Sequence, residues 1–435
     1  MNVKGATAER VPVSVFGGRV MLYRAGKRGA EPVILIHGLG TPAARDWAEV
    51  IPALAGSYDV YALDLPGFGA SDKGNHLYSP ANYVRVLDAL FRERLKRPAS
   101  IVGHSMGGVV ALAYAIAYPE RVRRLVVVDV AGVLHRSVYG EYMGRMLVER
   151  KLGGDSPWSE LLARVITAQA ENLPAKGAMS IEIPQVRQRL LRGDPTAIAA
   201  LALVEHDLGR GLRTIRAPTL VIWSSDDRVA PPRTGQALAS AIPGARLAVI
   251  DEAGHAPQIS QPARFSALLG DELRGRLDLK PYAQPPAAPA AGRSASCVSE
   301  RGRQFSGDYE EIVLRGCADV EISNARVGKL VAARSQVRIV NSHIRDGVEA
   351  HDSRIEFTGG SLGGDPPLFL DETSIDAAAL RFLPRGPVVA ANYGEGQITL
   401  RLSVSEIVGA RGETRYAHQI LRLVEDQSWT PRGAR

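Results

Sequence analysis

Short apolar runs alternate with segments of helical periodicity between residues 32 and 269, and no other feature constrains the fold as strongly. Strands separated by helices in this way predict βαβ units and a parallel sheet. The runs are continuously apolar, which indicates strands buried on both faces with helices packed on each side. We therefore predict a doubly wound α/β sheet with strands at residues 33–36, 60–63, 100–102, 125–128, 219–222 and 247–250.

The alternation is interrupted between residues 134 and 212, where the spacing of Leu, Met and Val is helical and almost no strand pattern remains. Because this segment lies between two predicted strands, we interpret it as a helical insertion that forms a cap. Proline and alanine then dominate residues 280–292, a composition typical of a semi-rigid linker. The 435-residue chain is therefore predicted to have two domains, residues 1–279 and 293–435.

The last third of the chain repeats with a period of 17 to 23 residues, with Gly, Ser, Asn and Asp at the corners. Short strands that are apolar at alternate positions bury no face alone but share one core when they stack. The pattern predicts a right-handed parallel β-helix of about five coils; the alternative is a β-sandwich with coincidental spacing. The apolar positions form three series: Ile312/Leu314, Leu330/Ala332, Val348/Ala350, Leu368/Leu370 and Val388/Ala390; Val320/Ile322, Val337/Ile339, Ile355/Phe357, Ile375/Ala377 and Ile398/Leu400; and Val327, Ile344 and Leu362.

Residues 103–107 are Gly-His-Ser-Met-Gly, directly after a predicted strand and before a helical run. A sharp strand-to-helix turn strains its central residue and brings the residues two positions before and after it close together. Only small residues fit there, which accounts for Gly103 and Gly107. The turn lifts the Ser105 hydroxyl clear of the sheet and aims a helix N-terminus at developing negative charge. Ser105 is therefore the candidate nucleophile.

Two more loops follow predicted strands. Residues 37–40 are His-Gly-Leu-Gly, and the glycines, Gly38 among them, let the backbone curl so that an N–H faces an oxyanion. We expect the backbone N–H groups of Leu39 and Met106 to be the oxyanion donors, and His37 to support the loop from the strand end. Asp64 begins a Pro-Gly turn and is expected to bond the local backbone rather than take part in catalysis.

Candidates for an acid and a base follow later strands. Asp226 and Asp227 come after the predicted strand at 219–222, and Asp129 follows an earlier strand as a geometric rival. His255 lies in a loop after the last strand. Because the carboxyl ends of parallel strands share one edge of the sheet, a loop histidine there can reach the nucleophile. The other histidines lack this placement.

Together these motifs resemble the α/β-hydrolase family over about the first 275 residues. The resemblance implies that Asp227, directly before Arg228, is the acid that orients His255. Two departures are Ser224, where relatives usually carry glycine, and Gln261, where they often carry glutamate. The resemblance rests on His-Gly-Leu-Gly at 37–40, Asp-Leu-Pro-Gly-Phe-Gly at 64–69, Gly-His-Ser-Met-Gly at 103–107, Asp-Asp-Arg-Val at 226–229 and Gly-His at 254–255.

The resemblance implies a serine hydrolase that cleaves a small-molecule carboxylic ester through an acyl-enzyme, without a cofactor or metal. Ser105 disfavours the aspartate-nucleophile chemistry of dehalogenases and soluble epoxide hydrolases. An acyltransferase or a carbon–carbon hydrolase with the same triad stays open. So does a non-catalytic scaffold whose β-helix binds a glycan or protein partner, although all three triad positions are filled. The apolar cap suggests a medium, apolar acyl group.

Composition excludes several other classes. The formal charge is +7, but no short basic block interleaved with aromatics indicates nucleic-acid binding. No apolar run approaches the length of a membrane span. The first ten residues lack the apolar core of a secretory signal, so we expect a cytoplasmic protein, or an extracytoplasmic one if the true start lies upstream. Cys297 and Cys317 are expected either to form one bridge, if the protein is exported, or to be free thiols.

Overall fold

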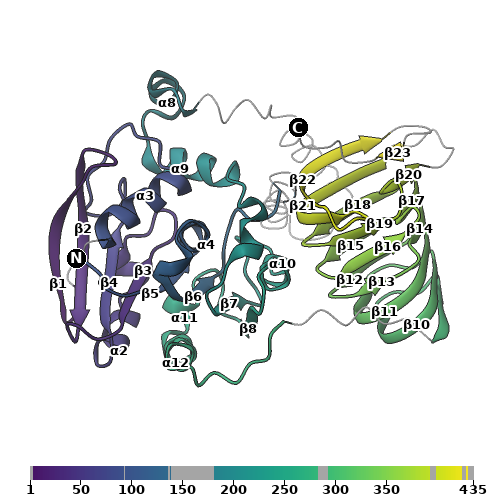
Figure 1. Cartoon of the computed structure of the whole chain (residues 1–435), viewed down its shortest axis with the longest axis horizontal. Coiled ribbons are helices and arrows are strands. Elements are labelled where there is room, and N and C mark those ends of the chain that lie inside the picture. Colours follow the sequence, from purple (N-terminus) through teal and green to yellow (C-terminus); the bar gives the residue numbers. More distant parts are fainter. Residues whose placement is uncertain are drawn as a thin grey trace. The chain divides into compact units, whose positions relative to one another are not determined.

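The computed structural model describes residues 3–92, 94–135, 138, 181–282, 292–391, 398–423 and 428–429. It divides into two compact units, one of Met1–Gly235 with Ile242–Pro281 and one of Gln236–Ala241 with Tyr282–Arg435 (Figure 1). Each unit has its own hydrophobic core. Among the described residues, no helix is long and apolar enough to cross a membrane.

An eight-stranded sheet in the order β1-β2-β4-β3-β5-β6-β7-β8 forms the centre of the first unit. β1 and β2 pair antiparallel, as do β2 and β4, and every other pair in this sheet is parallel. The strands predicted from the apolar runs are confirmed, whereas β1 and β2 were not predicted. The bounds are β1 Ala6–Val13, β2 Gly18–Gly26, β3 Pro32–Ile36, β4 Asp59–Asp64, β5 Ala99–His104, β6 Val122–Val128, β7 Thr219–Ser224 and β8 Arg246–Ile250.

Helices cover both faces of this sheet, as the continuously apolar strands predicted. On one face Trp47 and Phe265, whose rings are 6.3 Å apart, pack with Val33 and Leu35 of β3 in one core. On the other face α4 packs against β5, β6 and α3. The helices are α1 Ala43–Asp46, α2 Val50–Ala55, α3 Pro80–Phe91, α4 Met106–Ala117, the 3₁₀ turn η1 Pro119–Arg121, α10 Arg233–Ala241, α11 Pro257–Ser260 and α12 Pro262–Leu273.

The helical insertion predicted for residues 134–212 falls between β6 and β7. Its described part is helical, with α8 Pro184–Leu191, α9 Pro195–Val204 and the 3₁₀ turn η2 Gly209–Thr214. Arg187 of α8 anchors it, because Nε donates to Asn75 Oδ1 at 3.2 Å and Nη2 donates to the Asn75 carbonyl at 3.0 Å. Residues 139–180, on which the rest of the expected cap depends, lie outside the described residues.

The second unit is rich in short strands that pair in parallel with the strand one repeat later (Figure 1). Two antiparallel pairings, β21 with β22 and β20 with β23, occur at its C-terminal end. This parallel order is unlike the antiparallel sheets of a β-sandwich. The strands are β9 Arg293–Val298, β10 Gln304–Arg315, β11 Val320–Ala333, β12 Gln336–Val340, β13 His343–Ile344, β14 Val348–His351, β15 Arg354–Thr358, β16 Ser361–Gly364, β17 Leu368–Asp371, β18 Ser374–Ala378, β19 Arg381–Pro384, β20 Val389–Ala391, β21 Ile398–Val408, β22 Thr414–Leu423 and β23 Ser428–Trp429.

Members of each of the three apolar series pair with one another on neighbouring strands, so that each series forms one column of stacked residues. Two predicted registers at its C-terminal end are wrong: Leu368 pairs with Val389 rather than Val388, and Ile375 pairs with Leu400 rather than Ile398. Both valines are buried, and β21 is buried at alternate positions where it begins. Since neighbouring registers bury equally apolar residues, the pattern alone does not choose between them.

Hydroxyl groups stack at one corner of the repeats. The Cys317 N–H donates to Ser335 Oγ at 3.0 Å, the Ser335 N–H donates to Ser353 Oγ at 3.1 Å, and the Ser353 N–H donates to Thr373 Oγ1 at 3.3 Å. Each hydroxyl thus satisfies a backbone donor that the turn removes from the strand ladder. These hydrogen bonds are the structural reason for the Ser residues at the predicted corners, and Thr373 takes the same role in one repeat.

A disulfide joins Cys297 and Cys317, with Cα atoms 6.4 Å apart. Cys297 lies on β9, whose partner β10 ends two residues before Cys317. Of the two states left open by the sequence, the structure has the bridge, and it links the first strands of the second unit.

Candidate active site

The turn between β5 and α4 carries Ser105, which has φ 52° and ψ −117°. A Cβ added to Gly103 would lie 2.3 Å from the Gly107 carbonyl oxygen, and one added to Gly107 would lie 2.3 Å from the Ile36 carbonyl oxygen. These distances give the steric reason for both glycines. The strained turn holds Ser105 at the carboxyl edge of the sheet, directly before the N-terminus of α4.

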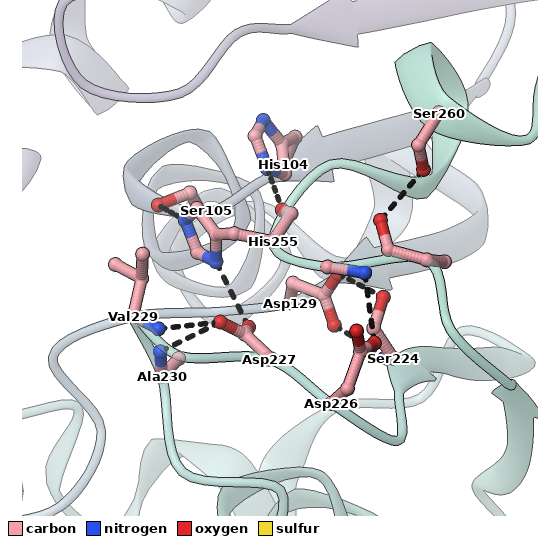
Figure 2. Close-up of polar contacts among 12 residues, drawn as sticks. His104, Ser105, Asp129, Ser224, Asp226, Asp227, Val229, Ala230, His255 and Ser260 are labelled. Atoms are coloured by element: carbon pink, nitrogen blue, oxygen red, sulfur yellow. Dashed lines mark hydrogen bonds and ion pairs between the residues drawn. The ribbon is translucent and has the colours of Figure 1, made fainter. Parts of the chain in front are cut away.

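Ser105, His255 and Asp227 form a hydrogen-bonded chain at this edge (Figure 2). His255 Nε2 lies 2.9 Å from Ser105 Oγ, and His255 Nδ1 lies 2.8 Å from Asp227 Oδ2. The Asp227 side chain is fully buried, and that of His255 is 21% exposed. A buried carboxylate therefore orients the imidazole at Nδ1, and Nε2 is left facing the serine hydroxyl.

The backbone of the acid loop holds Asp227 in place. Its Oδ1 accepts hydrogen bonds from the N–H groups of Val229 at 2.7 Å and Ala230 at 3.0 Å. Asp226 points elsewhere, and its Oδ1 accepts from the Gly254 N–H at 2.8 Å. The two adjacent aspartates thus differ in their contacts. Asp227 faces the imidazole of His255, and Asp226 links its own loop to the loop that carries His255.

Asp129 is a second buried carboxyl beside this chain. Its two oxygens accept from the Ser224 N–H and hydroxyl, both at 2.8 Å, so the departure at Ser224 has a specific partner. Burial and the nearby Asp227 raise the pKa of Asp129 to about 8. Asp129, Asp227 and His255 place ligand-type atoms within 4.8 Å of one another. Because the facing His255 and Asp227 atoms are already hydrogen-bonded, we assign no metal there.

The loop at residues 37–40 lies opposite the nucleophile. A Cβ added to Gly38 would lie 3.3 Å from Ser105 Cβ, so the loop passes directly beside the serine. Within the described residues, neither the Leu39 N–H nor the Met106 N–H donates to a protein acceptor. Both groups are therefore available to an oxygen atom bound beside the serine.

His37 and Asp64 contact the backbone behind this loop. His37 Nδ1 donates to the Gly38 carbonyl at 2.7 Å, and its Nε2 accepts from the Leu65 N–H at 2.9 Å. Asp64 accepts from the Ala43 N–H at 2.7 Å and the Ala70 N–H at 2.8 Å. Burial lowers the pKa of His37, in keeping with a neutral ring. Both side chains contact the loops rather than Ser105.

Two side chains that the sequence did not single out lie against the site. His104 lacked the loop placement expected of a base, yet its ring centroid is 5.1 Å from that of His255. It pairs with the buried Asp46, with 3.0 Å between Nδ1 and Oδ2. The Gly-His-Ser motif placed His104 next to the nucleophile, but nothing in the sequence indicated a partner at residue 46. Gln261, the second position at which the sequence departs from the family pattern, donates from Nε2 to the Asp251 carbonyl at 2.7 Å. This bond stabilises the loop that carries His255.

A doubly wound sheet with a serine, a histidine and an aspartate joined at its carboxyl edge defines a hydrolase-type fold and site. A family model described as the alpha/beta hydrolase fold matches residues 31–262, more than half of the chain. The chain therefore belongs to the α/β-hydrolase fold family.

Relatives in this family are hydrolases of several kinds. The chain is 36% identical to a 2-hydroxymuconate semialdehyde hydrolase from Pseudomonas sp. strain CF600, covering 59% of this chain and 91% of the relative. It is 30% identical to a pimeloyl-[acyl-carrier protein] methyl ester esterase from Neisseria meningitidis, covering 61% and 82%. A solved thermophilic esterase from Thermogutta terrifontis is 27% identical, with a TM-score of 0.46, covering 62% and 99%.

Proposed function

We propose that the protein is a serine hydrolase that cleaves carboxylic esters through an acyl-enzyme on Ser105. The observation that carries the proposal is the continuous hydrogen-bonded chain from Ser105 through His255 to Asp227. A serine hydroxyl is a weak nucleophile unless an adjacent base takes its proton, and His255 Nε2 is in position to do so. A non-catalytic scaffold has no need for this chain, so we rank that alternative below the enzymatic ones.

The proposed reaction proceeds in two balanced steps. Ser105 Oγ attacks the ester carbonyl while its proton passes to His255 Nε2, and the imidazolium that forms is stabilised by Asp227. The Leu39 and Met106 N–H groups hold the oxyanion, and the loss of one such donor typically costs about 3 kcal/mol of transition-state stabilisation. His255 then protonates the departing alcohol. Water, deprotonated by His255, releases the acid and restores Ser105.

Carbon–carbon bond hydrolysis is the second candidate, because some relatives are named as hydrolases of 2-hydroxymuconate semialdehyde or of 2-hydroxy-6-oxononadienedioate, which are not esters. The same three side chains would serve, with a carbon leaving group protonated in place of an alcohol oxygen. Acyl transfer to an acceptor other than water is a third use of the same acyl-enzyme. Fold does not decide among them, since function depends on the site and on what covers it.

The decisive experiment compares wild type with Ser105→Ala on a chromogenic short-chain ester and on 2-hydroxymuconate semialdehyde. We expect a burst and steady turnover with the ester, fluorophosphonate labelling of Ser105, and loss of all three in the variant. Turnover of the semialdehyde with no ester cleavage would favour the second candidate. Substantial turnover by Ser105→Ala would reject the mechanism.

We also propose that the segment at about residues 134–212 caps the site and that its apolar residues select a medium, apolar acyl group. The helices α8 and α9 support this, since they stand between β6 and β7 in the chain. A series of esters with acyl groups of increasing length tests the selection. Preference for charged acyl groups would contradict it.

For the C-terminal part we propose a right-handed parallel β-helix over residues 293–435, joined by a linker at 280–292 to a hydrolase domain at 1–279. The parallel pairing of successive repeats supports it. A glycan or protein partner for this domain stays a prediction. Two measurements on the full chain test it: binding to a glycan array and co-purification of a protein partner. Either signal should be lost when outward-facing residues of β14 and β17 are changed.

A further inference from the structure

His104 takes part in no step of the proposed mechanism, yet its side chain is almost fully buried beside the site. Its Nδ1 lies 3.0 Å from Asp46 Oδ2 and its Nε2 lies 2.7 Å from the His255 carbonyl oxygen, the second contact visible in Figure 2. A carboxylate and a carbonyl both accept hydrogen bonds and have no proton to give. The ring of His104 must therefore carry hydrogen on both nitrogens, as an imidazolium.

Asp46 balances this buried charge. Its Oδ2 also accepts from the Gly38 N–H at 2.9 Å, and its Oδ1 accepts from Gln258 Nε2 at 2.9 Å. Burial lowers the pKa of His104, but attraction to Asp46 and the two hydrogen bonds outweigh burial and raise it to about 9. Burial tends to raise the pKa of Asp46, but its interactions with His104 prevail and leave it lowered. Each partner thus keeps the other ionised.

The pair connects the three segments that carry the proposed chemistry. Through the Gly38 N–H it holds the loop that contains Leu39. Through its own backbone His104 precedes the nucleophile, and through Nε2 it holds the segment of His255. A Cβ on Gly38 would lie 2.9 Å from His104 Nδ1, so the oxyanion loop packs directly on the ring. The pair therefore contacts all three segments at once.

We propose that His104 and Asp46 are a positioning pair that sets the spacing of the oxyanion loop, the nucleophile and the base, and that removal of a ring proton from His104 in alkaline solution weakens the site. The proposal rests on the proposed serine hydrolase function. With one ring hydrogen lost, a nitrogen lone pair faces either the Asp46 carboxylate or the His255 carbonyl. The nitrogen lone pair and the oxygen that it faces are both hydrogen-bond acceptors, and burying them against each other without a donor is unfavourable.

Among the described residues, the titratable groups around His104 are Asp46, His37, His255 and Asp129. Asp46 stays ionised, and His37 stays neutral because burial lowers its pKa. His255 is the proposed base. Asp129 is the other group with alkaline behaviour, since its pKa is raised to about 8 by burial and Asp227. Asp129→Asn therefore serves as the control that separates the two alkaline effects.

The test measures the rate at which a fluorophosphonate labels Ser105 in the full chain between about pH 6 and about pH 10. Labelling reports on the nucleophile and its base without knowledge of the substrate. We expect the wild-type rate to fall about tenfold as the pH rises past about 9, the value at which His104 loses its proton. We expect Asp129→Asn to show the same fall.

Two variants separate the two hydrogen bonds of the ring. His104→Gln can keep a donor near the position of Nε2, His104→Asn can keep one near Nδ1, and neither side chain titrates. We expect each to label about 10- to 100-fold more slowly than wild type at neutral pH, because displaced reacting groups lose rate, and to show no alkaline fall. Wild-type rates in both variants, or an unchanged alkaline fall in both, would overturn the proposal.

The protonation of the ring is measured independently by ¹⁵N NMR of the histidine side chains of wild type, with the His104 signal assigned through the backbone resonances of the same residue. Two protonated nitrogens at neutral pH are expected, and a neutral ring would overturn the pair even if the variants failed to fold. If wild type fails to label at any pH while the ring is doubly protonated, the proposed function fails rather than the charge state of the pair.

Discussion

Asp227 and Asp129 occupy one edge of the sheet, but their contacts assign them different roles. Asp227 contacts His255 directly, whereas both oxygens of Asp129 face Ser224. Removing the charge of the acid deprives the imidazole of its orientation and its stabilising partner. We expect Asp227→Asn to lower kcat by about 10⁴-fold, with Asp129→Asn losing far less. Steady-state kinetics on the best ester decides this, and equal losses would contradict the assignment.

The raised pKa of Asp129 predicts a pH dependence of stability. Its folded-state pKa of about 8 exceeds the ordinary value of 3.8, so the folded protein binds more protons than the unfolded chain between these values. The stability contributed by the protonated carboxyl is full at low pH and is lost as the pH rises toward about 8, with a slope of at most about 1.4 kcal/mol per pH unit.

Asp129→Asn has no titrating carboxyl and can still pair with Ser224 through its amide. We therefore expect the Tm of this variant, relative to wild type, to be higher at about pH 9 than at about pH 5. Thermal unfolding at both values measures this difference. A Tm difference that is the same at both would show that Asp129 does not titrate within the window.

At the scale of elements, the hydroxyl ladder of the second unit satisfies buried backbone donors. Ser335→Ala leaves the Cys317 N–H without its acceptor and removes the donor that bonds the Ala333 carbonyl. We expect a loss of about 1–3 kcal/mol in the free energy of unfolding. Ser323→Ala on the outward face of β11 is the matched control and should change it by less than about 0.5 kcal/mol. Denaturant unfolding followed by circular dichroism compares the two variants.

The disulfide closes a separation of 20 residues at the first strands of the same unit. A crosslink of this span removes conformations from the unfolded chain and is worth about 3 kcal/mol in the chain-entropy account. We expect Cys297→Ala with Cys317→Ala, or reduction of wild type, to destabilise the unit by about that amount. Unfolding that is indifferent to reductant would show that the bridge does not form in solution.

For the whole molecule, the two separate cores predict two thermal transitions. A covalent adduct on Ser105 belongs to the first unit, and the disulfide belongs to the second. We expect the fluorophosphonate adduct to shift one calorimetric transition and reductant to shift the other. A single transition moved by both treatments would mean that the units unfold together.

Much of this architecture follows from local pattern. The apolar runs at residues 125–128 and 219–222 form strands in which every residue is buried. Both faces of these strands are therefore covered, as a continuous apolar run predicts. The antiparallel β1 was missed because it is mostly exposed and carries Glu9 and Arg10. Its partner β2 was missed because polar residues such as Arg19 and Arg24 interrupt its apolar residues. The registers at Val389 and Leu400 were missed because adjacent registers bury equally apolar residues.

The sequence by itself determined the six parallel strands of the first sheet, the turn at Ser105, the repeat and the candidate His255, and the family resemblance selected Asp227. These depend on sterics and periodicity over a few residues, or on motifs whose spacing is local. Only the tertiary structure paired His104 with Asp46, 58 residues away, and Asp129 with Ser224, 95 residues away. Such contacts have no period in the sequence, because they are set by where separate strands and helices meet, and that is decided when the sheet and its helices are assembled.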